Sequence, residues 1–320
     1  MKILLTRNLT GAMNQQQDYL SDSIFHGLKK LGNEVVDAPR LWYMYSSEFQ
    51  NNNSIQKLYG KGFTLYGLLN EQEDTVDRSD IVRKIINKYF DLIIIARFDL
   101  STPYLEVILE NYPANRIVVL DGWDGVNYPH LVTAPEIVAQ CHFSNFDLIR
   151  SIEYKTIYFK RELSEPRKNV YSIPFSFPKE KIRPRTVKSK PFSHIDPRDT
   201  ATYIHYDENS YYNDYGGSLF GVTMKKVGWD CLRHYEILGI RCVPHFIDID
   251  ECPPDICISL PKKELKEINL LIKQYGAEIF LDRYLDLYDS YEHRIHQHFI
   301  NNCTTEAVAK YMLDTVESLQ

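Results

Sequence analysis

Two lysines, two arginines and a glutamate gather in residues 218–248, SLFGVTMKKVGWDCLRHYEILGIRCVPHFID. Lys225 and Lys226 precede a predicted helix, and Arg233 and Glu236 lie three residues apart within it. Side chains at this spacing share one helix face, so they project toward the same space. A helix N-terminus with nearby cations suits phosphate groups, and a carboxylate suits two ribose hydroxyls. The pattern predicts a nucleotide diphosphate site; a surface ion pair between Arg233 and Glu236, with solvated lysines, is the alternative.

A predicted strand–helix–strand unit positions these side chains. SLFGVT is typical of a strand, WDCLRHYEIL of a helix, and CVPHFID of the next strand. Asp230 can cap the helix, and Gly239 falls where a left-handed residue is wanted at the helix end. The polar groups therefore lie at the carboxyl end of a strand, where open α/β domains bind their ligands.

The same stretch resembles the donor-binding region of GT-B glycosyltransferases and is most similar to their exostosin-like branch. In that branch a serine-led strand is followed by a short loop, an R-x-x-E helix and the sequence G-C-I-P-V-I. The turn GIRC in this chain is longer by two residues than the usual form. The resemblance covers residues 215–261, and it is carried by Ser218, Phe220, Gly221, Gly228, Asp230 and the run RHYEILGIRCVPHF.

This resemblance implies a nucleotide-sugar-dependent glycosyltransferase with two Rossmann-like domains facing each other across a cleft. Glu236 would bind the donor ribose, and Arg233 and Lys226 would bind the diphosphate. The acceptor, a glycan or another hydroxyl compound, would bind mostly to the first domain. A helix dipole and cations can neutralise the leaving group, so no cofactor and no Mg²⁺ or Mn²⁺ dependence is expected. The expected donor-binding residues are Ser218, Gly221, Lys225, Lys226, Arg233 and Glu236.

An inverting transfer also needs a base that deprotonates the acceptor hydroxyl. We expect it in a loop that follows a strand of the first half. Asp99 follows DLIIIARF and Asp124 lies in LDGWDG, and these two are the predicted catalytic residues. Asp121 and Asp18 are further candidates, and Trp123 could stack on a sugar ring. Aspartates at such positions also serve as helix caps or turn residues, and a retaining reaction would need no such base.

Two other patterns could bind a metal ion. Asp248 and Asp250 form a D-x-D sequence, whose oxygens suit Mg²⁺ or Mn²⁺, but the motif is short and lies beyond the second strand. His293, His296 and His298 lie in one predicted helix, but offsets of three and five do not place all of them on one face. We therefore expect no metal site.

The chain as a whole has the pattern of an α/β protein. Apolar runs such as DLIIIARFD and RIVVLDG are typical of parallel strands covered by helices on both faces. The second half is less regular; ICISLP indicates a further strand, and two helices are expected at the end, over residues 278–299 and from Thr304 or Thr305. We expect two Rossmann-like domains, residues 1–174 and 175–320, with a helical tail and a basic linker at residues 178–191.

Composition excludes several classes of protein. The net charge of −6 disfavours nucleic-acid binding as the main role, because a phosphate backbone requires a basic surface. No apolar segment is long enough for a membrane helix, and the polar residues after MKILLT do not form a signal peptide, so a cytoplasmic location is expected. The six cysteines have no CxxC pair and are expected to be reduced thiols.

Two further hypotheses remain open. The chain could be a non-catalytic module that binds a nucleotide or sugar, since no base is obvious. Alternatively, it could be an assembly subunit that holds partners through its helical tail and tyrosine-rich surfaces, because 23 tyrosines are many for this length.

Overall fold

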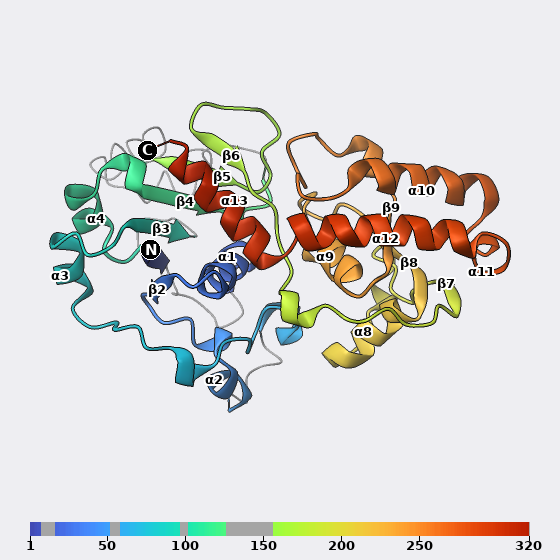
Figure 1. The fold of residues 1–320 in the computed structure, drawn as a ribbon, viewed down its shortest axis with the longest axis horizontal. Coiled ribbons are helices and arrows are strands. Elements are labelled where there is room, and N and C mark those ends of the chain that lie inside the picture. Colours follow the sequence, from blue (N-terminus) through green and yellow to red (C-terminus); the bar gives the residue numbers. More distant parts are fainter. Residues whose placement is uncertain (8–16, 52–57, 97–101, 126–155, 320) are drawn as a thin grey trace.

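Two parallel sheets form the framework of the protein in this computed structural model, which describes all residues except 8–16, 52–57, 97–101, 126–155 and 320 (Figure 1). The first sheet has six strands in the order β2-β1-β3-β4-β5-β6, and the second has three in the order β7-β8-β9. The α/β class expected from the sequence is confirmed. The strands are β1 (Lys2–Arg7), β2 (Glu34–Asp37), β3 (Leu92–Ala96), β4 (Ile117–Asp121), β5 (Ile157–Lys160), β6 (Val170–Ser172), β7 (Lys190–Phe192), β8 (Ser218–Thr223) and β9 (Val243–Phe246).

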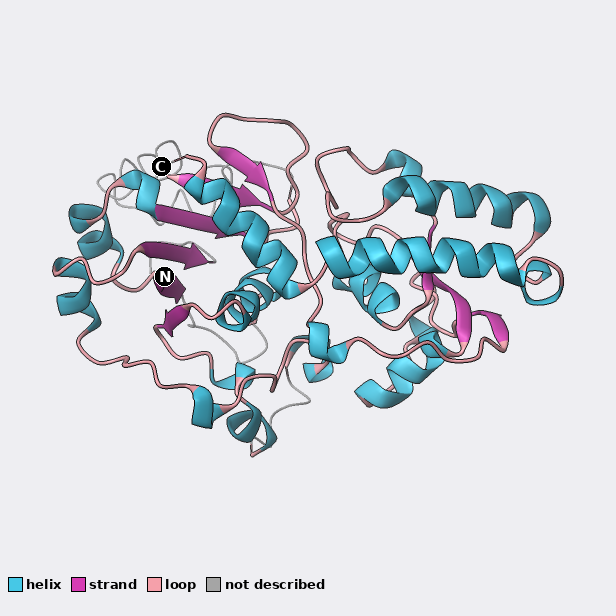
Figure 2. Cartoon of the chain, in the orientation of Figure 1, coloured by secondary structure: helices cyan, strands magenta, loops and turns pink. Residues whose placement is uncertain are grey.

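Helices cover both sheets (Figure 2). Every residue of β3, β4 and β8 is buried, as the continuous apolar runs require of strands with two covered faces. The α-helices are α1 (Tyr19–Lys30), α2 (Ser46–Gln50), α3 (Ile81–Ile86), α4 (Leu105–Asn111), α8 (Glu208–Gly216), α9 (Leu232–Gly239), α10 (Lys262–Tyr275), α11 (Ile279–Asp282), α12 (Leu285–Asn302) and α13 (Thr305–Glu317). Short 3-10 helices occupy Trp42–Met44, Tyr59–Gly62, Glu71–Glu73, Ala114–Arg116, Lys179–Lys181, Thr200–Thr202 and Ile249–Glu251.

The last helix leaves the second sheet and packs against the first domain. Figure 1 shows α13, in red, lying beside α1, in blue. Thr304 caps α13, because its side chain accepts a hydrogen bond from the N–H of Ala307. The imidazole of His26 in α1 lies 2.9 Å from the hydroxyl of Thr305. The helical tail expected from the sequence is therefore part of the core of the molecule.

Some local expectations were wrong. ICISLP forms turns instead of a strand, and the helix expected over residues 278–299 is interrupted between α11 and α12. Cys231, not Asp230, stands at the N-cap of α9, and the left-handed residue after that helix is Arg241, with φ of 61°. Gly239 instead makes room for the ring of Phe177, whose nearest carbon would lie 2.5 Å from an added Cβ.

Some basic residues of the expected linker, 178–191, make specific contacts, although residues 183–187 are exposed. Lys181 pairs with Glu208 at 2.5 Å, and Glu180 pairs with Lys30 of α1 at 3.0 Å. Lys188 donates to the carbonyl oxygens of Gly216 and Arg241 at 2.8 and 2.6 Å. This segment is held against both halves of the chain.

The cysteines within the described residues are free thiols: Cys231, Cys242, Cys252, Cys257 and Cys303. Across these residues, no helix combines the length and apolar character that a membrane span needs.

Candidate functional site

Strand β8, the loop after it and helix α9 carry all six residues predicted to bind a donor. Ser218 and Gly221 are buried in β8: the hydroxyl of Ser218 donates to the carbonyl oxygen of Asp214 at 2.6 Å, and a Cβ at Gly221 would lie 2.9 Å from Ile237. Lys225 and Lys226 lie in the loop. The ammonium of Lys225 is 4.9 Å from the centre of the Trp229 ring. The ammonium of Lys226 donates to the carbonyl oxygen of Pro197 at 2.5 Å.

Glu236 is buried and accepts one hydrogen bond on each carboxylate oxygen. The hydroxyl of Thr64, from the first half of the chain, donates to Oε1 at 2.5 Å, and the hydroxyl of Tyr211 donates to Oε2 at 2.5 Å. Burial raises the pKa of Glu236, although these hydrogen bonds and the charge of Arg233 oppose the shift. A carboxylate so placed holds two hydroxyl groups, one on each oxygen.

Arg233 lies on the same helix, partly buried beside tyrosines. Its Nη2 donates to the hydroxyl of Tyr203 at 3.1 Å, and its Nη1 is a buried donor without an acceptor in the described part of the chain. Glu236 is only 8% exposed, and the described contacts of its two oxygens are with hydroxyl groups. A surface ion pair with Arg233 is therefore not what this part of the structure shows. The guanidinium of Arg233 therefore has an N–H group without an acceptor in the described part of the chain, on the same helix as the buried carboxylate of Glu236.

The loop ahead of α9 holds a carboxylate that sequence reasoning missed. The oxygens of Glu162, which follows β5, accept the N–H groups of Trp229 and Asp230 at 3.0 and 2.9 Å. Neighbouring N–H groups ahead of a helix also suit a phosphate. The charged pair Arg161–Glu162 directly after a buried strand was the signal in the sequence.

Arg161 connects the carboxyl ends of both sheets. Its guanidinium donates to the carbonyl oxygen of Gly122 after β4 at 3.1 Å and to that of Asp230 after β8, and it pairs with Glu162 at 2.8 Å. The side chain is 2% exposed, and its cation lies 4.5 Å from the centre of the Phe175 ring. The loops that follow β4, β5 and β8 therefore meet, although their strands belong to different sheets.

We call this meeting of the loops that follow β4, β5 and β8 the junction, and Asp230 is part of it. Its carboxylate accepts the N–H of Phe175 and the hydroxyl of Tyr235, each at 2.7 Å. Burial raises the pKa of Asp230, against the opposing charge of Arg161. The side chain predicted to cap α9 instead joins that helix to the end of the first sheet.

The predicted catalytic aspartates have different surroundings. Asp124 pairs with Arg161 and is 48% exposed, whereas Asp99 lies outside the described residues. Asp121 accepts hydrogen bonds from Tyr158 and Lys160 at 2.8 and 3.0 Å. Asp18 caps α1 through Oδ1, and its Oδ2 is buried with no partner in the described part of the chain. Asp124 is thus the candidate base that lies in the junction itself.

Trp123 stands beside these aspartates with its side chain 58% exposed. The backbone N–H of Trp123 donates to Asp121 Oδ1 at 3.0 Å, so the turn that carries this ring is held by the aspartate.

The metal-ligand patterns do not assemble. Asp248 accepts the N–H of Lys225 at 3.2 Å, whereas Asp250 is 80% exposed and pairs with Lys266 at 3.3 Å. His298 bonds the carbonyl oxygen of Ser259 at 2.7 Å, and His296 stacks on Phe299. Within the described ranges, no three histidine, cysteine or acidic side chains are grouped closely enough to hold a metal ion.

At the carboxyl end of β1, Arg7 and Asp22 form a buried ion pair. The two side chains are 0% exposed, and the distance from Nη1 to Oδ1 is 2.8 Å. The hydroxyl of Tyr43 donates to the same oxygen at 2.9 Å. Burial raises the pKa of Asp22 to about 7, although Arg7 opposes the shift.

Asp22→Asn should gain stability relative to the wild type as the pH rises. Between the ordinary pKa of 3.8 and the native value of about 7, the folded protein holds a proton that the unfolded chain has released. Wild-type stability attributable to Asp22 therefore falls across this window, and asparagine, which does not titrate, removes the loss. Urea unfolding of both proteins at the two ends of the window measures the difference. A relative loss for the variant at higher pH would mean that the native state favours the charged carboxylate.

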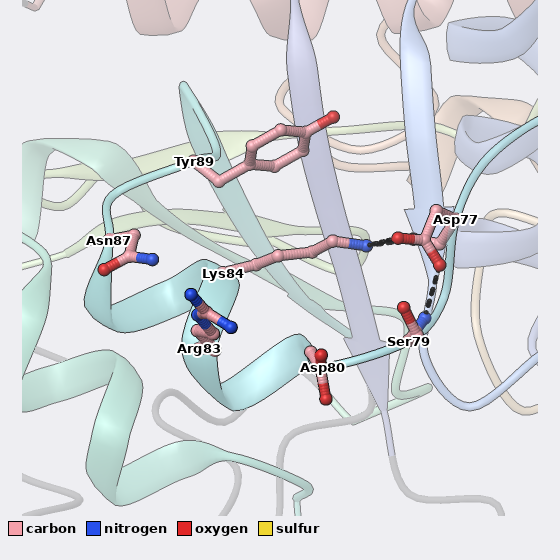
Figure 3. Close-up of a pocket in the computed structure, with 7 residues that line it drawn as sticks. All are labelled: Asp77, Ser79, Asp80, Arg83, Lys84, Asn87 and Tyr89. Atoms are coloured by element: carbon pink, nitrogen blue, oxygen red, sulfur yellow. Dashed lines mark hydrogen bonds and ion pairs between the residues drawn. The ribbon is translucent and has the colours of Figure 1, made fainter.

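A pocket of about 230 Å³ lies at the amino ends of strands in the first sheet (Figure 3). Its lining includes Lys84, which pairs with Asp77 at 2.8 Å. It also includes Tyr89, and the ammonium of Lys2, at the start of β1, lies over the Tyr89 ring. Open α/β domains bind ligands at the carboxyl ends of their strands, and this pocket lies at the amino ends. We therefore place the candidate site at the junction of the two sheets.

No protein-family model matches this sequence, and no curated protein matches it either.

Proposed function

We propose that the protein is a nucleotide-sugar-dependent glycosyltransferase with a GT-B-like arrangement of two domains. The observation that carries the proposal is the meeting of the carboxyl ends of β5 and β8 through Arg161, Glu162 and Asp230. Ligands of open α/β domains bind at these ends, so two of them in contact suit a reaction between two bound substrates. The donor would bind along β8 and α9, and the acceptor hydroxyl compound would approach from the first sheet.

Each side chain has a role in this proposal. The two oxygens of Glu236 would accept the two hydroxyls of the donor ribose, as they now accept those of Thr64 and Tyr211. Arg233, Lys226 and the N-terminus of α9 would stabilise the negative charge that develops on the leaving diphosphate. Asp124 would accept the proton of the acceptor hydroxyl if the reaction inverts configuration.

Glu236→Gln should weaken binding of a nucleoside diphosphate about 30-fold. An amide accepts on one atom only, so one hydrogen bond to a charged group is lost, worth about 2 kcal/mol. The measurement is calorimetric titration with UDP, GDP, ADP and dTDP, with EDTA and with Mg²⁺ or Mn²⁺. Asp250→Asn is the matched control, because this carboxylate lies in the same half of the chain and is 80% exposed. Equal affinities for the wild type and Glu236→Gln would remove Glu236 from the site.

A non-catalytic binding module is the second candidate. It is favoured by the pairing of Asp124, the candidate base, with Arg161. Release of free nucleotide from a nucleotide sugar, with and without a panel of glycan acceptors, separates the candidates. Binding of the nucleotide sugar without any turnover would favour the module.

A further inference from the structure

Residues 58–67 reach from the first half of the chain to Glu236. Thr64 is buried, and its hydroxyl lies 2.8 Å from that of Tyr212 in addition to its bond with Glu236. The N–H of Thr64 donates to Glu208 at 2.6 Å, and the ammonium of Lys61 donates to the carbonyl oxygen of His205 at 2.5 Å. Segment 58–67 is therefore held to the second half by polar contacts centred on Thr64 and by the ring of Phe63, whose centre lies 5.8 Å from that of Tyr211.

The backbone of segment 58–67 is strained where it makes these contacts. Lys61 and Thr64 have φ of 58° and 66°, in the left-handed region that residues with a Cβ avoid. A β-branched residue such as threonine is a clear outlier there. Strain of this kind persists only where surrounding contacts enforce it, and it is concentrated at ligand sites and switches.

The segment packs closely against the first half on both sides of Thr64. A Cβ at Gly60 would lie 2.0 Å from the hydroxyl of Tyr19, and one at Gly67 would lie 2.6 Å from the ring of Phe49. The N–H of Gly67 donates to the carbonyl oxygen of Tyr43 at 2.9 Å. If the contacts at Thr64 broke, the middle of the segment could relax while its ends stayed in place.

The bond from Thr64 uses the same oxygen of Glu236 that a ligand hydroxyl would need. One hydroxyl comes from segment 58–67, and the other, from Tyr211, comes from the same half as Glu236. A diol ligand could replace the pair, so that the carboxylate again accepts two hydroxyls once the exchange is complete. The exchange would also release the backbone strain at Thr64.

We infer that segment 58–67 is an internal competitor for the ligand of Glu236, and that Thr64 must leave before a nucleotide can bind. This inference rests on the proposed function, because it regulates the same site. The affinity observed for the ligand then equals the intrinsic affinity multiplied by the fraction of molecules in which the segment is open. Weakening the Thr64 contact should tighten binding without any new contact to the ligand.

The test compares Thr64→Val with Thr64→Ser in the full chain. Valine keeps the branched shape and lacks the hydroxyl, whereas serine keeps the hydroxyl. Hydrogen exchange without nucleotide should be faster in segment 58–67 of Thr64→Val than in that of the wild type and of Thr64→Ser, and unchanged in α9 of both variants. Thr64→Val should bind UDP or GDP about tenfold more tightly than the wild type, because about 1.4 kcal/mol of competition is removed. Lys61→Ala, at the exposed contact with His205, is the second variant if valine prevents folding, and it should show the same changes on a smaller scale.

The two measurements separate the inference from the function. Unchanged exchange in segment 58–67, or faster exchange with unchanged nucleotide affinity, would overturn the inference whatever the function is. Faster exchange together with tighter binding supports both. Faster exchange with no nucleoside diphosphate bound by any variant would leave the segment as a releasable contact at Glu236 and refute the proposed donor.

Discussion

Arg161→Met should lower the free energy of unfolding by about 3–5 kcal/mol, because it leaves the buried charge of Glu162 without its cation. Glu162 is 0% exposed and depends on Arg161 at 2.8 Å. The carbonyl oxygens of Gly122 and Asp230 also lose their donor. Methionine retains the length and much of the apolar volume, so the expected loss is mainly electrostatic. Urea denaturation gives the value.

A surface arginine and a double variant give the controls for this prediction. Arg198→Met removes an arginine that pairs with Asp196 but is 62% exposed, and a loss below about 1 kcal/mol is expected. Arg161→Met combined with Glu162→Gln should be less destabilised than the sum of the single changes, since the unpaired charge is gone. Strict additivity would show that Arg161 and Glu162 do not act as a pair.

The contact of Arg161 with Asp230 also matters for the proposed site. It fixes the loop ahead of α9, and this helix carries Arg233 and Glu236 of the proposed donor site. Loss of nucleotide binding in Arg161→Met at a temperature where the variant is still folded would therefore agree with the proposal. Stability and binding must be measured on the same preparations.

Gly27→Ala should cost about 3 kcal/mol and release α13 from α1. A Cβ at this position would lie 2.0 Å from the backbone carbonyl oxygen of Thr305 and 2.9 Å from the Cβ of Ala309. A backbone atom cannot move aside as a side chain can, so the helices must separate. The clash has to exceed the gain of about 1 kcal/mol that alanine brings to a helix interior.

The place where hydrogen exchange becomes faster distinguishes a local separation of α1 and α13 from a general loss of stability. Hydrogen exchange should rise in α13 and α1 first, while β8 and β9 remain protected. Gly217→Ala is the matched control, because the nearest atom to its added Cβ is 3.6 Å away and its φ of −78° suits alanine. If Gly27→Ala is as stable as the control, the close approach of α1 and α13 is not required.

Local sequence patterns were sufficient for the class of the fold. Runs such as LIIIA in β3 and SLFGVT in β8 are buried on both faces, as their largely apolar composition predicts. The helix that carries Arg233 and Glu236 was also predictable, because its apolar spacing and its polar residues lie within one short stretch. Its caps were not, since Asp230 is engaged by Phe175 and Tyr235.

The tertiary structure alone decided which distant groups contact one another in the candidate site. The sequence alone identified Glu236 as a carboxylate suited to hydroxyl groups, but Thr64, which now donates to it, lies 172 positions away. Glu162 meets the N–H of Asp230 across 68 positions, and Gly27 faces Thr305 across the two ends of the chain. Helix and strand periods report which face of one element is buried. They carry no information about which distant side chain satisfies a buried charge, because that partner is selected by the packing of whole elements.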